Sequence, residues 1–297
     1  MSAMQTTNEI RLKNVLYATD FSRPADAAFP YAAEFARRFG AKFYAVHVRT
    51  PDNYLLAAPE SWSIANAEFE KQENALRAVL RCDLPHLETE VMAVEGGIWP
   101  ALESVIHENQ IDLLVLGTHG RTGIKKFLLG SVAEEIVRRA TCPVLTVGPH
   151  SLSGPPLEGR FHEILYATDF SEASVAAAPY VAELSSEHHA QLTLLHVVRK
   201  FRTGEPMRPD EIEADAIERM QHLIPEKAAL WSQPRYAVRE GDPAEAILEE
   251  ARGRKADLIV LGVRKPSSSP ERIPHLLAAI THKVIAQAAC PVLTVRS

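Results

Sequence analysis

The sequence lacks the features that mark membrane, secreted and metal-binding proteins. None of its apolar runs reaches the length that spans a bilayer, and the first residues, MSAMQTTNEIRLK, are too polar for a secretory signal. The three cysteines show no paired spacing, and the twelve histidines form no His-x3-His or His-Cys cluster. These absences argue against a membrane protein, a secreted protein and a metal site, and they make the cytoplasm the expected location.

A basic charge balance is also missing. The formal net charge of −6 argues against general nucleic-acid binding, because neutralising a phosphate backbone requires a basic face. With 46% hydrophobic and 24% charged residues, the composition is typical of a soluble globular protein, and 297 residues suit two compact domains. Cys142 and Cys290 each precede Pro-Val-Leu-Thr-Val, where a small buried hydrophobe suits the entrance of a strand. We therefore interpret these cysteines as structural.

An internal repeat organises the chain. LYATDFS begins at Leu16 and returns 149 positions later, CPVLTV begins at Cys142 and returns after 148, and DLLVLG at Asp112 is matched by DLIVLG after 145. The stretch between the copies, GPHSLSGPPLEGR at residues 148–160, is too rich in glycine, proline and serine for a helix or a central strand. The predicted organisation is a first domain at 1–147, a linker at 148–160 and a second domain at 161–297.

Strands and helices alternate in both copies. In the first copy we expect strands at 14–19, 42–48, 88–94, 111–116 and 144–147, with helices at 22–39, 62–81, 98–108 and 132–140. In the second we expect strands at 164–168, 192–198, 235–239, 258–261 and 292–295, with helices from 172, 210 and 243 and near 273–288. Alternation implies parallel pairing through right-handed crossovers. The predicted fold is two tandem flavodoxin-like or Rossmann-like α/β domains, each with a parallel sheet of order 3-2-1-4-5.

The loop GTHGRTGIKKFLLGS at residues 117–131 follows a buried strand and ends at the start of a helix. Gly117 and Gly120 have no Cβ, so a ligand could approach the main chain there. Gly130 and Ser131 would present N–H groups and a hydroxyl at a positive helix terminus, which suits a phosphate chain. The alternative is a plain turn followed by an N-cap. The spacing matches neither a P-loop nor the dinucleotide fingerprint.

Asp20 is expected in the same crevice as this loop. It ends the first strand and Gly117 ends the fourth, and in the order 3-2-1-4-5 a ligand binds beyond the carboxyl ends of those two strands. A carboxylate repels phosphate, so Asp20 would accept hydrogen bonds from a base or a ribose, unless it only caps the following helix. His119 and Arg121 could donate to phosphates, or they are simply exposed loop residues.

The spacing Gly-x2-Gly-x9-Gly-Ser, together with LYATDFS, the His47-Val48 pair and CPVLTV, resembles the universal stress protein family in its tandem form. The resemblance covers essentially both halves and implies an adenine nucleotide alpha hydrolase-like fold that binds ATP, alone or with Mg²⁺. Asp20 and the backbone of Val48 would hold adenine and ribose, and the glycine loop would hold the triphosphate. The residues expected at the site are Ala18, Thr19, Asp20, Val48, Gly117, His119, Gly120, Arg121, Gly130, Ser131 and Val132.

The second copy departs from this pattern. Asp169, Gly262 and the pair at 196–197 are retained, but Lys265 replaces the second glycine and no Gly-Ser precedes the final helix. Half of a pocket without its phosphate cradle indicates a degenerate nucleotide site. We therefore expect one nucleotide per chain, bound in the first domain.

The resemblance implies a stress-related regulatory role in which nucleotide binding controls contact with a protein partner that the sequence does not identify. One alternative is a slow ATP hydrolase or phosphotransferase, which would need a positioned base and carboxylates for Mg²⁺ where, apart from Asp20, the loop offers only His119 and Ser131. Another is an interaction module with no nucleotide. The family pattern also implies that the two Val-Leu-Thr-Val strands pair within the chain as an internal pseudo-dimer, and a homodimer stays open.

Overall fold

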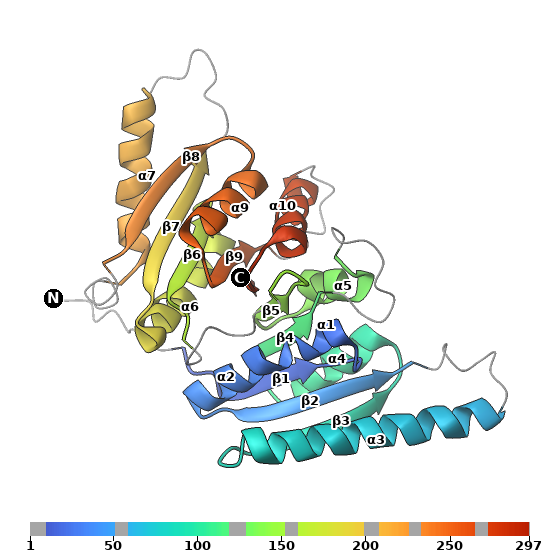
Figure 1. The fold of residues 1–297 in the computed structure, drawn as a ribbon. Helices are drawn as coiled ribbons and strands as arrows, with labels where there is room; N and C mark the ends of the chain where they lie inside the picture. Colours follow the sequence, from blue (N-terminus) through green and yellow to red (C-terminus); the bar gives the residue numbers. More distant parts are fainter. Residues whose placement is uncertain are drawn as a thin grey trace. The chain divides into compact units, whose positions relative to one another are not determined.

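The computed structural model describes residues 10–50, 59–118, 129–151, 160–198, 208–225, 233–264 and 273–296. The chain divides into two compact units, coloured blue to green and yellow to red in Figure 1. Residues 12–155 form most of the first unit, and residues 156–284 with 292–296 form most of the second. We call these units the first and the second domain and describe each by itself.

The first domain is a parallel sheet with helices between successive strands. Its strands are β1 (Asn14–Ala18), β2 (Lys42–Arg49), β3 (Thr89–Glu95), β4 (Leu113–Gly117) and β5 (Val144–Val147). Its helices are α1 (Arg23–Asp26), α2 (Phe29–Phe39), α3 (Pro59–Asp83), α4 (Ile98–Glu108) and α5 (Ser131–Arg139). The strands lie in the order β3-β2-β1-β4-β5, and each neighbouring pair is parallel. The predicted order 3-2-1-4-5 is confirmed.

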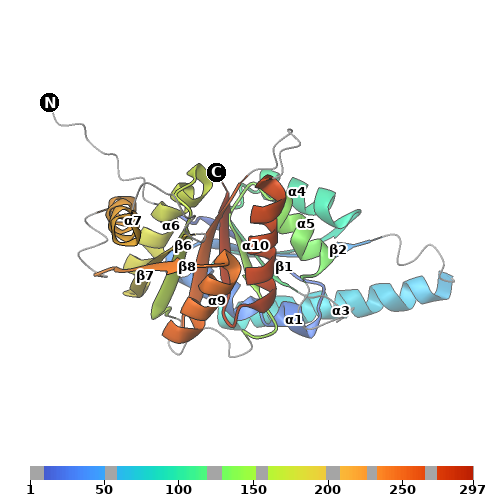
Figure 2. The ribbon, with the colours of Figure 1, turned by 90° about the horizontal axis from the view of Figure 1, so that it is seen from above.

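The second domain repeats this topology. Its strands are β6 (Glu163–Thr168), β7 (Gln191–Val198), β8 (Arg235–Glu240), β9 (Leu258–Val263) and β10 (Val292–Arg296). Its helices are α6 (Glu172–His188), α7 (Pro209–Leu223), α9 (Pro243–Arg254) and α10 (Ile273–Gln287). The parallel order is β8-β7-β6-β9-β10. Figure 2 shows α6 and α7 on one side of these strands and α9 on the other, as right-handed crossovers require.

The predicted helix at 22–39 is two helices. Ser22 caps α1, with its Oγ accepting the Ala25 N–H at 3.4 Å, but the helix stops at Asp26 and α2 begins at Phe29. Pro30 stands in the first turn of α2, where it has no N–H to continue the ladder of hydrogen bonds. The second copy holds Pro179 inside α6, which nevertheless continues without a break. The expectation of one continuous helix is therefore wrong for the first domain alone.

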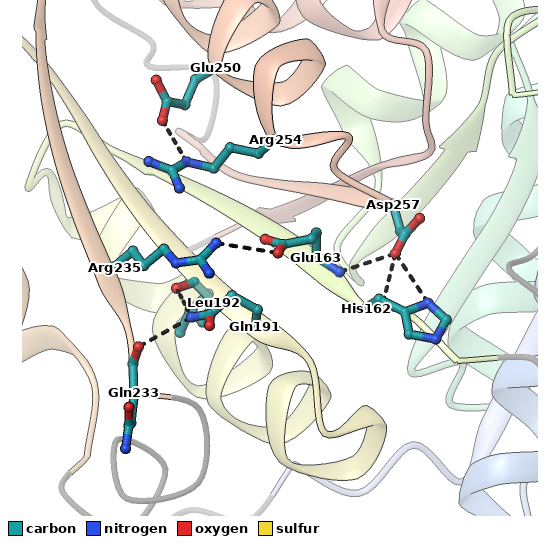
Figure 3. Close-up of polar contacts among 9 residues, drawn as sticks. All are labelled: His162, Glu163, Gln191, Leu192, Gln233, Arg235, Glu250, Arg254 and Asp257. Carbon is teal, nitrogen blue, oxygen red and sulfur yellow. Dashed lines mark hydrogen bonds and ion pairs between the residues drawn. The ribbon is translucent and has the colours of Figure 1, made fainter.

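Each domain ties the first strand of its sheet to the fourth with one aspartate. Asp112 Oδ2 accepts the backbone N–H groups of residues 13–14 at 2.7 and 2.9 Å. Asp257 Oδ2 accepts those of residues 162–163 at 2.7 and 3.1 Å, as Figure 3 shows. The aspartate that opens both copies of the motif Asp-Leu-x-Val-Leu-Gly therefore sets the alignment of the two strands whose far ends form the candidate site.

Two tyrosines fix the start of the helix that follows the first strand. The Tyr17 hydroxyl donates to the carbonyl oxygen of Ala25 at 3.0 Å, and the Tyr166 hydroxyl donates to the carbonyl oxygen of Ser174. Both tyrosines are almost fully buried, so their hydroxyl groups require partners. The first turn of the helix is thereby held against the sheet. In the part of the chain that the structure describes, no helix is both long and apolar enough to cross a membrane.

Candidate functional site

The candidate site lies at the carboxyl ends of β1, β2 and β4. Ala18 pairs with Leu116 on one side and with Val46 on the other. Thr19 and Asp20 therefore emerge beside Gly117, the last residue of β4. Since β2 continues past Val46 to Arg49, Val48 also lies beyond the end of β1. The structure thus brings the predicted residues of three strands to one edge of the sheet.

The turn that holds Asp20 is built by side chains. Thr19 Oγ1 accepts the Phe21 N–H at 2.9 Å, and Asp20 Oδ1 accepts the Ser22 N–H at 3.0 Å. Phe21 has a φ of +59°, a left-handed conformation that few residues other than glycine adopt. Asp20 supports the turn before α1, but the N-cap is Ser22, so the alternative in which Asp20 caps the helix is wrong.

His47 holds this turn from the neighbouring strand. Its Nδ1 lies 2.8 Å from the carbonyl oxygen of Thr19, and because a carbonyl only accepts, Nδ1 carries the proton. The imidazole is buried between the rings of Phe21 and Phe69, with centroids 4.7 and 4.8 Å away. His47, which belongs to the His-Val pair of the family resemblance, therefore supports the turn that carries Asp20.

A hydrogen bond joins the end of β4 to the start of α5. The N–H of Gly130 donates to the carbonyl oxygen of Thr118 at 2.9 Å, and the Thr118 N–H donates to Val147 of β5 at 3.0 Å. We expected Gly130 to offer its N–H to a phosphate, but that group is used inside the protein. The remaining first-turn N–H groups at this end belong to Ser131, Val132 and Ala133. Ala133 is buried, whereas Ser131 and Val132 are exposed and Val132 keeps 39% of its surface accessible.

The first turn of α5 could accept an anion. Its N-cap, Gly130, is extended, with φ −62° and ψ 143°, and has no side chain that could occupy the first-turn N–H groups. These groups carry the positive end of the helix dipole, so the arrangement fits a phosphate. His119, Gly120 and Arg121 lie outside the described residues.

No sequence motif indicates the charged side chains of β2 and α3 that lie near this end of the sheet. Arg49 and Glu73 form an ion pair of 2.7 Å, and the Arg49 guanidinium lies 5.8 Å from the centre of the Phe69 ring. The spacing of residues 49, 69 and 73 along the chain carries no recognisable motif, so only the packing of α3 reveals the group.

The equivalent edge of the second domain keeps the turn. Thr168 Oγ1 accepts the Phe170 N–H and Asp169 Oδ1 accepts the Ser171 N–H, both at 3.0 Å, and His196 Nδ1 lies 2.8 Å from the Thr168 oxygen. The other oxygen of Asp169, however, lies 3.8 Å from a guanidinium nitrogen of Arg264. Burial acts to raise the pKa of Asp169, but hydrogen bonds with Ser171 and the Arg264 charge bring it below its ordinary value.

Gly262 is retained in the second domain for a reason of packing. A Cβ added there would lie 2.2 Å from the carbonyl oxygen of Ala173 and 2.3 Å from the Cα of Ser174. The first turn of α6 therefore leaves room only for glycine at the end of β9. The position requires glycine whether or not a ligand binds near it.

Two of the three cysteines fit the structural interpretation. Cys142 and Cys290 are buried, and burial raises the pKa of the Cys142 thiol to about 12, so it stays protonated at neutral pH. Cys82, near the end of α3, is exposed. Among the residues whose placement is described, no group of three His, Cys, Asp or Glu side chains could hold a metal ion.

Both domains have the same parallel strand order, and both keep the same turn at the carboxyl end of their first strand. These features place the chain among tandem α/β proteins whose domains each form a doubly wound parallel sheet. The sequence model of the universal stress protein family matches residues 11–148 and again 160–296. The chain therefore belongs to the universal stress protein family, with two copies of the family domain in one polypeptide.

Curated relatives match at the level of one domain. A universal stress protein of Methanocaldococcus jannaschii is 32% identical over 148 residues, which are 46% of this chain and 81% of that protein. One from Thermus aquaticus is 36% identical over 140 residues, 46% of this chain and 99% of that protein. A crystal structure of a universal stress protein from Archaeoglobus fulgidus has a TM-score of 0.72 at 21% identity, covering 97% of this chain and 99% of that chain. That likeness shows the fold across both domains.

Proposed function

We propose that the first domain binds an adenine nucleotide, ATP in particular, and that binding regulates contact with a protein partner during stress. The observation that carries the proposal is the meeting of Asp20, Gly117 and the α5 terminus at one edge, in the copy that has the full glycine loop. The regulatory role follows from family membership, because a fold does not determine a cellular role.

The two ends of the nucleotide would meet different elements. Asp20 and the main chain of Val48 would receive ribose and adenine at the ends of β1 and β2. The loop that starts at Gly117 and the first turn of α5, at Ser131 and Val132, would receive the phosphates. Any Mg²⁺ would arrive with the triphosphate and neutralise part of its charge.

Calorimetric titration with ATP tests the proposal. Wild-type protein should bind close to one ATP per chain. Gly120→Val should abolish binding because a branched side chain would intrude on the phosphate path, and Ser131→Ala should weaken it less. Lys265→Val changes the position that replaces this glycine in the second copy and should leave binding unchanged. Unchanged affinity in Gly120→Val, or a stoichiometry near two, would refute the proposed site.

We also propose that the protein hydrolyses ATP very slowly or not at all, because the loop supplies few groups that could act as a base. Release of phosphate from ATP should stay far below one per second in purified protein. Hydrolysis at several per second, an ordinary enzyme rate, would contradict this if Gly120→Val removed it, since a contaminating ATPase would survive that substitution.

The internal pairing of the two final strands stays a prediction. Each Val-Leu-Thr-Val segment closes the strand order of its own domain, and fusing two domains raises the effective concentration of one strand for the other. Leu145→Pro should disrupt this pairing and give an expanded X-ray scattering profile. An unchanged profile in a folded variant would count against an internal pseudo-dimer.

A further inference from the structure

Five side chains near the carboxyl end of β2 contact one another in a row, and we call this group the α3 stack. In order they are Phe21, His47, Phe69, Arg49 and Glu73. Phe21 belongs to the turn after β1, His47 and Arg49 to β2, and Phe69 and Glu73 to α3. The stack therefore connects α3 to the turn that holds Asp20.

The ion pair anchors one end of the stack. Glu73 is only 8% exposed, and a carboxylate removed from water to this extent is costly unless it is paired. Arg49 Nη2 donates to Glu73 Oε1 at 2.7 Å, a short charge-assisted hydrogen bond. The Arg49 Nε atom is buried and has no partner among the described residues. Loss of either partner would therefore leave the other without compensation and loosen α3 against β2.

The other end of the stack reaches the candidate site. His47 donates to the Thr19 carbonyl, and the Thr19 hydroxyl accepts the N–H of Phe21. Val48 stands between His47 and Arg49, so both of its neighbours in sequence are held by α3. The two elements proposed to meet adenosine, the Asp20 turn and the Val48 main chain, thus share one support.

The second domain provides an internal comparison. His196 repeats the hydrogen bond of His47, but Val198 occupies the place of Arg49. The sheet register confirms the equivalence, because Arg49 pairs with Glu95 in β3 and Val198 pairs with Glu240 in β8. Valine cannot form an ion pair with a helix. Among the described residues, the arginine–glutamate anchor therefore occurs in the copy that carries the glycine loop, whereas in the second copy α7 contacts the turn through Arg219, which lies 3.9 Å from the centre of the Phe170 ring.

We infer that the Arg49–Glu73 pair, acting through Phe69 and His47, positions the adenosine-binding edge of the first domain. The inference rests on the proposed ATP site and adds a positioning device to it. The phosphates would be held by β4, the glycine loop and α5. The ring contacts and the ion pair that form the α3 stack involve no described residue of these elements. Loosening the pair should therefore weaken adenosine recognition and leave phosphate recognition intact.

The test uses full-length protein and two ligands, with ATP titrated directly and adenosine measured by competition against ATP. Glu73→Gln should weaken both ligands by the same factor, about tenfold, as expected for loss of a buried coupled interaction. Ser131→Ala should weaken ATP but not adenosine. Arg49→Lys keeps the charge and should retain most of the affinity for both.

A matched control separates positioning from general stability. Glu250 in the second domain is also 8% exposed and pairs with Arg254 and Arg239 at 2.6 and 2.8 Å; Figure 3 shows the first pair. Glu250→Gln should lower stability much as Glu73→Gln does, yet leave both affinities unchanged. If Glu73→Gln lowers stability without changing either affinity, or weakens ATP alone, the inference is wrong.

Failure of Glu73→Gln to fold and failure of the wild-type protein to bind either ligand have different meanings. If Glu73→Gln does not fold, the double variant Arg49→Val with Glu73→Gln decides, because it leaves no unpaired charge and copies the valine of the second domain. The double variant should show the same equal loss for ATP and adenosine, and wild-type affinity for both would overturn the inference. If wild-type protein binds neither ligand, the proposed function itself fails and the inference falls with it.

Discussion

Gly262 illustrates how one residue can match a ligand motif and yet be required by packing. Its hydrogen atoms face the backbone of residues 173–174, where any Cβ would overlap main-chain atoms that cannot rotate away. Shared glycines in the two copies are therefore weak evidence for shared ligands. The informative differences between the copies lie at Lys265 and Val198.

Replacing Gly262 by alanine should destabilise the second domain by about 3 kcal/mol or more, because overpacking against backbone forces α6 away from β9. Denaturant unfolding of the full chain measures the effect. Gly253→Ala is the matched control, since nothing lies within 4 Å of the added methyl group and the site is inside α9. That change should stabilise by about 0.5–1 kcal/mol. Equal effects of the two substitutions would contradict the packing explanation.

His196 should titrate below the ordinary histidine value of 6.5. Burial lowers its pKa first, and the Arg219 charge adds to this, against the opposing effects of the Thr168 carbonyl and of Asp169 and Asp215. The folded domain then binds fewer protons than the unfolded chain below about pH 6.5. Its contribution to stability is complete above that pH and is lost as the pH falls through the folded-state pKa.

An NMR pH titration of the His196 ring checks this prediction directly. Urea unfolding at pH 7 and pH 5 should show a smaller pH dependence in His196→Asn, whose side chain can still donate to the Thr168 carbonyl but does not titrate. A His196 pKa at or above 6.5 in the folded protein would refute the proposed direction.

At the scale of the element, the strand pair that supports the candidate site depends on one aspartate in each domain. Asp112→Ala removes the acceptor for two backbone N–H groups and should cost about 1.5–3 kcal/mol, the range for hydrogen bonds to a charged group. Asp257→Ala should cost a similar amount in the second domain. Glu103→Ala, an exposed position on α4, serves as the control and should change stability by less than about 0.5 kcal/mol.

Hydrogen exchange can assign each loss to a domain. Asp112→Ala should increase exchange in β1 and β4 and leave β6 and β9 protected, and Asp257→Ala should do the reverse. Faster exchange spread evenly over both domains would show that the aspartates do not act locally.

For the whole molecule, the difference between the two copies predicts that ATP stabilises one domain. At a free concentration one hundred times its dissociation constant, ATP should stabilise the first domain by about 2.7 kcal/mol. Hydrogen exchange with and without ATP should show slower exchange at residues 113–118 and 129–139 and no change at residues 258–263. Equal protection of both domains would mean that the altered loop at Lys265 still binds nucleotide.

Local patterns in the sequence were sufficient to predict most of the architecture. The repeat and the alternation of strands and helices predicted two parallel α/β domains with right-handed crossovers, and the order 3-2-1-4-5 followed from taking each domain as a doubly wound sheet. The limits of the predicted helix at 22–39 were set by residues that favour caps, because capping depends on the residue itself: Ser22 caps α1, and Gly40 ends α2 with a φ of +62°. The convergence of Asp20 and Gly117 followed from topology alone.

Tertiary structure decided what depends on contacts between residues distant in sequence. The Gly130 N–H is directed to Thr118, Gly262 is required by the first turn of α6, and Arg49 meets Glu73 only because α3 packs over the end of β2. No periodicity or spacing encodes such pairs, since each is selected by the distance and burial that the finished fold imposes. The sequence by itself therefore determined which strand ends meet at the candidate site, and the packed structure determined which side chains hold them there.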